Sequence, residues 1–115
     1  MISNNDFKTF QYNILGPQTL LRGDVHFCGD AIITAAIEGN IKMLNTGKLI
    51  LERGSSVKGR IEAFDLEIFG QVEGDIISEG AVSIRSSAQV VGSIKAKKLI
   101  IYPGAVVDTQ ATSQG

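Results

Sequence analysis

The sequence predicts an all-β fold: a single-stranded parallel β-helix, a solenoid in which short strands stack in successive rungs. Three observations predict it. The 115 residues include 13 Gly, 15 Ile and 8 Val but no Trp, a composition that favours short strands separated by turns. Two short apolar motifs alternate along the chain at a repeating interval. No segment has a 3.6-residue apolar period long enough to form a helix.

Each repeat begins with an apolar-x-apolar motif, which predicts one strand with two inward side chains. The motif occurs five times, with starts 16 to 18 residues apart, at residues 31–33, 49–51, 66–68, 82–84 and 99–101. Upstream, Leu15 occupies the second apolar position of a less regular copy. Similar residue types at one-repeat spacing favour stacking in register, with inward side chains in columns about 4.8 Å apart per rung.

Each repeat continues with an apolar-x-Gly-x-apolar motif, which predicts two further extended pieces joined at a corner. Its copies lie at residues 21–25, 37–41, 57–61, 72–76 and 90–94. Glycine adopts positive φ angles at little cost, so we place each glycine at a corner. A small residue two positions before each copy indicates a second, crowded corner. The distance from the start of the strand motif to this glycine is ten residues in two repeats and eight in two others.

The repeats predict a three-sided solenoid domain of about six rungs at residues 13–109. We expect residues 1–12 to form a flexible N-terminal tail. Residues 110–115 are predicted to be a short disordered C-terminal tail, because all six residues are small or polar.

The residues that precede the central glycines support this stacking. Arg22, Glu38, Lys58 and Glu73 are placed in one outward column of alternating charge, which Val91 continues. Like charges on neighbouring strands destabilise a sheet, so the alternation favours the predicted register.

Both ends of such a solenoid expose unpaired strand edges and an apolar cross-section, which are templates for another chain. Repeat proteins usually close their ends with polar capping units, and the polar C-terminal tail is too short to form a capping helix. We therefore expect end-to-end assembly of copies of this chain. The candidate assembly residues are Leu15, Leu21 and Val25 at the N-terminal end, and Leu99, Ile101 and Val107 at the C-terminal end.

Composition excludes several classes of function. A net charge of −1, with basic residues spread along the chain, argues against a nucleic-acid partner. One Cys and one His exclude a disulfide framework, a Cys-ligated zinc site and a three-His metal centre. The chain has neither a signal-peptide pattern nor a span of about 18 apolar residues, so we expect a cytoplasmic protein.

No catalytic, cofactor-binding or metal-binding residue is predicted. The sequence around His26 shows neither an acid motif nor a strict hexapeptide pattern, so a surface role is favoured over that of a general base. Cys28 has no electropositive neighbourhood in the sequence and is interpreted as a structural thiol. Asp24, Asn40 and Asp75 share a column but lack the pattern of calcium-binding repeats.

The register of the two motifs, ending in Ile-Tyr-Pro-Gly-Ala at residues 101–105, resembles the bactofilins. The resemblance covers residues 15–107 and implies a right-handed, three-sided β-helix. It also implies that the protein polymerises without nucleotide into filaments that have no structural polarity. Family members typically lie at the inner face of the bacterial membrane and position cell-wall or morphogenetic proteins. The chain departs from the family pattern at residues 107–109, Val-Asp-Thr, where a Phe and a Gly are frequent.

The sequence therefore predicts a non-enzymatic cytoskeletal subunit that serves as a scaffold. Candidate contacts with the inner membrane are Met1, Ile2, Phe7 and Phe10. The alternatives are that this segment is a disordered tail or that it covers the first rung.

Two other functions stay open. One is a solenoid enzyme, such as an acyltransferase-like trimer, which would need an acid–base pair and strict hexapeptides. The other is a monomeric adaptor that binds a partner through an outward apolar patch formed by Ile32, Ile50, Ile77 and Ile100.

Overall fold

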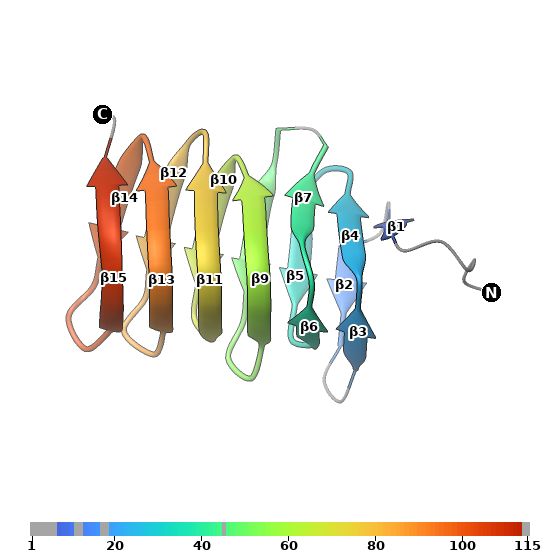
Figure 1. The fold of residues 1–115 in the computed structure, drawn as a ribbon, viewed down its shortest axis with the longest axis horizontal. Helices are drawn as coiled ribbons and strands as arrows, with labels where there is room; N and C mark the ends of the chain where they lie inside the picture. The colour runs from blue at the N-terminus through green and yellow to red at the C-terminus, as the bar shows by residue number, and fades with distance from the viewer. Residues whose placement is uncertain (1–6, 11–12, 17–18, 45, 114–115) are drawn as a thin grey trace.

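The structure, a computed structural model, describes residues 7–10, 13–16, 19–44 and 46–113. Each rung begins with a short strand on what we call the first side of the solenoid. These strands pair in parallel, in chain order, as a six-stranded sheet (Figure 1). They are β2 (Asn13–Leu15), β5 (Ala31–Ile33), β8 (Lys48–Leu51), β10 (Asp65–Ile68), β12 (Ala81–Ile84) and β14 (Lys98–Ile101). The described chain thus makes six rungs joined by five stacking contacts, and the predicted parallel β-helix is confirmed.

The second and third sides form one nine-stranded sheet, which bends where the two sides meet. In the first two rungs each side has its own strand: β3 (Leu20–Arg22) and β6 (Ala36–Glu38) on the second side, β4 (Asp24–Phe27) and β7 (Ile41–Met43) on the third. In later rungs one eight-residue strand crosses both sides: β9 (Ser56–Ala63), β11 (Gln71–Ser78), β13 (Gln89–Ala96) and β15 (Val106–Ser113). One further strand, β1 (Phe7–Phe10), pairs with β4 outside the first rung.

The register agrees with the predicted columns. On the first side Leu66 pairs with Leu49 and with Val82, so that equivalent residues of successive rungs are neighbours. On the second side Val72 pairs with Val57 and with Val90. Residues of these columns are at most 2% exposed in the interior rungs. The core is therefore a set of aliphatic columns, in which each side chain packs against its counterparts above and below.

A column of glycines forms the corner between the second and third sides. Gly39, Gly59, Gly74 and Gly92 have φ angles between +133° and +150°. A Cβ atom on any of them would overlap the carbonyl oxygen of the glycine in the preceding rung. Only glycine fits at these four positions, because both the backbone angle and the close approach of successive rungs exclude a side chain. In the last rung the register position next to Gly92 is Thr109.

The corner between the first and second sides is as crowded as predicted. Ala35, Ser55 and Ala88 are at most 2% exposed, and the Ser55 hydroxyl donates a 2.6 Å hydrogen bond to the Glu52 carbonyl. This corner has four residues in some rungs, such as 52–55, and only two in others, such as 69–70. The difference explains why ten or eight residues separate the two motifs.

The strands extend beyond the predicted limits of the repeat at both ends. Residues 7–10, assigned to the N-terminal tail, form β1, and β15 continues to Ser113 rather than ending near residue 109. Both extensions are explained by backbone pairing, which an edge strand offers to any extended segment regardless of its side chains. Among the described residues no helix is long and apolar enough to span a membrane.

Candidate assembly ends

The C-terminal end of the solenoid exposes residues that are buried in every interior rung. Ile101 pairs in register with Ile84, yet Ile101 is 48% exposed and Ile84 is 0% exposed. Leu99 and Val107, the other two predicted assembly residues here, are half-buried and pack against the core. β14 and β15 are the last strands of their sheets, so each has one edge without a described partner strand. The structure brings all three predicted residues to one open end.

The N-terminal end is open on two sides only. β2 and β3 each pair with a single described strand, so their outer edges are free of described strands. Leu15 lies at the register position next to Ile33, and Leu21 is half-buried. Val25, the third predicted residue, is 1% exposed because its strand is covered by β1. The structure therefore places Val25 beneath another strand and not at the open surface.

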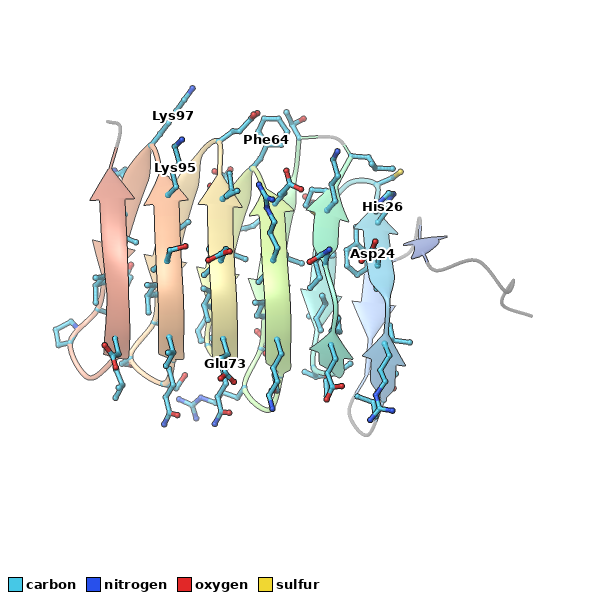
Figure 2. The ribbon with its side chains drawn as sticks, in the orientation of Figure 1. Asp24, His26, Phe64, Glu73, Lys95 and Lys97 are labelled. Carbon is cyan, nitrogen blue, oxygen red and sulfur yellow. The ribbon has the colours of Figure 1, made fainter. Side chains whose placement is uncertain are left out.

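The predicted membrane segment lies partly within the described chain. Phe7 and Phe10 belong to β1, where their register partners are Asp24 and Phe27. Asp24, labelled in Figure 2, is the first residue of β4. Met1 and Ile2 lie outside the described residues.

The outward charge column has the predicted register. Arg22, Glu38, Lys58 and Glu73 are successive register partners on the second side. The Arg22 guanidinium lies 3.1 Å from the Glu38 carboxylate, and both side chains are largely exposed. Glu73 projects outward near the start of β11 (Figure 2). The alternation therefore places opposite charges on neighbouring strands along four rungs.

A second charged cluster, which the sequence motifs do not indicate, links the last four rungs on the first side. The Glu67 carboxylate lies 2.9 Å from the Lys48 ammonium and 3.5 Å from the Arg85 guanidinium. The Arg85 guanidinium lies between two rings, 5.3 Å from the centre of Phe69 and 4.2 Å from that of Tyr102. The hydrogen bond and charge of Glu67 raise the pKa of Lys48. In the sequence this cluster is indicated only by spacing, because Phe69, Arg85 and Tyr102 follow one another at intervals of about one repeat.

The predicted apolar patch is wrong as a single surface. Ile32 and Ile50 are register partners on the first side, but Glu67 follows Ile50 in that column. Ile77 lies on the third side, where its register partners are Glu62 and Lys95. The four isoleucines therefore do not form one docking face for an adaptor, because charged positions and a corner separate them.

The residues considered for chemistry do not converge. His26 pairs in register with Lys42, and Arg60 separates Asn40 from Asp75 in the third-side column. No group of three or more His, Cys, Asp or Glu in the described ranges could hold a metal ion. A recess of about 480 Å³ at the corner between the first and second sides has no acid or His in its lining: Arg53, Gly54, Ser55, Ser56, Phe69, Gly70, Gln71 and Ser87.

Comparison with known proteins agrees with this geometry. The family model described as "Bactofilin: Polymer-forming cytoskeletal" matches residues 13–112. The chain is similar to Bactofilin BacO of Myxococcus xanthus (strain DK1622), with 29% identity over 92 residues, 80% of this chain and 71% of that relative. It is also similar to Bactofilin BacP of the same organism, with 28% identity over 92 residues that make up 38% of BacP. The chain thus spans less than half the length of BacP.

No solved structure matches the chain. The family match covers every rung of the solenoid, from the start of β2 to residue 112 in β15. The chain belongs to the bactofilin family of polymer-forming cytoskeletal proteins.

Proposed function

We propose that the protein is the subunit of a filament in which copies stack end to end without nucleotide. The observation that carries this proposal is the exposure of Ile101, 48%, against 0% for its register partner Ile84. Stacking another rung on β14 and β15 buries this apolar end. The polymer-forming character of the family supports the same conclusion.

Stacking supplies its own driving force. Each new contact removes apolar surface from water and pairs backbone groups that are otherwise bound only to water. These are the same interactions that join one rung to the next inside the subunit. Assembly therefore needs no hydrolysis step, and the protein acts as a structural element and not as an enzyme.

The test compares two single variants, Ile101→Lys and Val91→Lys, at positions whose side chains are about equally exposed. Ile101 is 48% exposed at the C-terminal end, and Val91 is 47% exposed on the second side. Both Ile101→Lys and Val91→Lys leave the new charge in water in the free subunit, so neither should unfold it. In a filament only the lysine at position 101 becomes buried without a partner.

Sedimentation and negative-stain electron microscopy, both without nucleotide, provide the measurement. We expect filaments from the wild type and from Val91→Lys, and only small species from Ile101→Lys. Filaments of normal length from Ile101→Lys would rule out stacking through this end.

We further propose that the filament is a scaffold for cell-shape or cell-wall proteins in the cytoplasm. A filament repeats the same three sides at every subunit, so weak binding of a partner to one side is multiplied along the polymer. In cells, Ile101→Lys should disperse such partners, whereas Val91→Lys should leave them in place. Equal dispersal by both variants would argue against a scaffold that depends on polymerisation.

The same multiplication supports peripheral contact with the inner membrane through Met1, Ile2, Phe7 and Phe10. A single short apolar segment binds lipid weakly, but many copies on one filament act together. Co-flotation of polymer with liposomes, with and without residues 1–10, tests this contact. Because filaments also sediment alone, each polymer is floated with liposomes through a density gradient. We expect only the full-length polymer to float with the liposomes, and equal flotation of the truncated polymer would exclude the membrane role of this segment.

A further inference from the structure

We propose that β1 and a second copy of the chain compete for the outer edge of β4 at the N-terminal end. This inference rests on the proposed end-to-end assembly and adds a constraint to one of its two ends. In the structure β1 pairs with β4 in parallel over four residues, from Phe7 opposite Asp24 to Phe10 opposite Phe27. β7 occupies the other edge of β4, so β1 fills the edge that faces outward along the rod (Figure 1).

The effect of β1 is visible in the burial of the first rung. Val25 and Phe27, on the third side, are 1% and 0% exposed, as in an interior rung. Leu21, on the second side of the same rung, is only half-buried, whereas its register partner Ile37 in the next rung is 0% exposed. The first rung is thus closed on its third side by β1 and open on the second.

The N-terminal end is therefore stepped, whereas the C-terminal end is level. β1 stands one strand beyond β2 and β3, which have no described strand on their outer edges. At the other end the last rung is formed by β14 on the first side and by β15 on the second and third sides. The outer edges of both strands carry no described strand, so all three sides end at the same level. A second copy that pairs with β2 and β3 meets β1 where it would pair with β4. Full contact on three sides requires β1 to leave.

β1 is a weak competitor for this edge. It contributes four residues, fewer than any of the eight-residue strands that stack deeper in the rod. A second copy offers pairing along all three sides together and buries the apolar end as well. The local strand has the advantage of being tethered, which makes its docking independent of protein concentration. β1 therefore does not forbid assembly but raises the concentration at which it begins.

The size of this effect follows from the occupancy of the edge. If β1 is docked in nine molecules out of ten, only a tenth of the N-terminal ends are competent, and the apparent affinity of that end falls about tenfold. Removing residues 1–10 should then lower the critical concentration for assembly by about tenfold.

The decisive experiment locks β1 in place with a reversible cross-link. Thr9 and His26 are register partners, and neighbouring strands are about 4.8 Å apart, within the range that a disulfide bridges. The variant Thr9→Cys/His26→Cys is made in a Cys28→Ser background, so that no other thiol is present. The control, Asp75→Cys/Ser93→Cys in the same background, cross-links register partners in β11 and β13, away from both ends.

The critical concentration is measured by sedimentation for each protein, oxidised and reduced. We expect oxidation of the Thr9→Cys/His26→Cys variant to raise it at least tenfold, or to stop assembly at small species, and reduction to restore it. The control should assemble equally in both states. Equal assembly of the locked and reduced variant, or weaker assembly after removal of residues 1–10, would overturn the competition while leaving end-to-end stacking intact. Absence of assembly from every reduced protein would overturn both proposals.

Discussion

The guanidinium of Arg85 lies 4.2 Å from the centre of the Tyr102 ring, and its other neighbour along the same corner is the ring of Phe69. Three successive rungs are thus joined on the outside of the rod by a cation between two aromatic faces. Glu67 adds an ion pair to the same guanidinium. This surface stack lies outside the aliphatic core and ties the last rung to the two before it.

Replacing Arg85 should therefore loosen the C-terminal rungs. Each cation–π contact at a partly exposed site is worth about 0.5 to 1 kcal/mol, so Arg85→Ala should lower the free energy of unfolding by about 1 to 2 kcal/mol. Arg53→Ala is the matched control, since Arg53 lies in an equivalent four-residue corner and is exposed. Urea unfolding in the Ile101→Lys background, kept monomeric, provides the measurement. Equal losses in both variants would show that the stack contributes nothing.

Gly74, at the glycine corner of an interior rung, should tolerate no side chain. Gly74 has a φ of +141°, and a Cβ there overlaps the carbonyl oxygen of Gly59, so Gly74→Ala should cost about 3 kcal/mol or more. Gly54 also has a positive φ, +89°, but its Cβ would meet open space. Gly54→Ala should cost only about 1 to 2 kcal/mol of backbone strain. Thermal and urea unfolding compare the two, and similar losses would mean that backbone strain alone accounts for the glycine at position 74.

The charge column should be sensitive to one reversal. Lys58 lies between Glu38 and Glu73, so Lys58→Glu places three carboxylates in successive rungs and should cost about 1 kcal/mol. Because these side chains are exposed, added salt should remove most of the loss. Lys95→Glu is the control, since its described neighbours in the column, Ile77 and Thr112, are uncharged. A salt-independent loss in Lys58→Glu would contradict an electrostatic origin.

The Lys48–Glu67 pair predicts a dependence of stability on alkaline pH. The Glu67 hydrogen bond and charge raise the pKa of Lys48 above 10.5 in the folded protein. The stabilisation is therefore fully present below pH 10.5 and is lost as the pH rises through the higher folded value. The free energy of unfolding of the wild type should decline more steeply there than that of Lys48→Met. Parallel profiles measured by urea unfolding would show that the pair does not titrate with folding.

The sequence is sufficient to predict the repeating part of this structure. Val57, Val72 and Val90 fall at one position of the repeat, and the structure places them in one column because identical rungs can only stack in register. The same reasoning places Ile101 in the last rung, where the structure leaves it 48% exposed. Corners between the motifs differ in length by two residues without disturbing the columns, because the extra residues project outward.

Features that occur once in the chain could not be predicted in this way. β1 carries neither motif, and its place on β4 depends on a free backbone edge, which has no residue signature. The repeat therefore predicts Val25 at an open end, whereas the structure covers its strand with β1. The pattern predicts outward side chains for both Ile77 and Ile32, but the structure places them on different sides of the solenoid, where they do not meet. The stack at Arg85 depends on the rotamers of three long side chains, which spacing alone does not specify.

The direction of the backbone hydrogen bonds has a mechanical consequence for a filament. In Figure 1 the strands run across the long axis of the molecule, so the hydrogen bonds between rungs lie along that axis. A pulling force on the ends is carried by all rung contacts in series. Inside a subunit the chain also links each rung to the next covalently, whereas the junction between subunits has no such link. Such a rod should resist stretching and fracture cleanly at its junctions, with each fragment keeping ends that can rejoin.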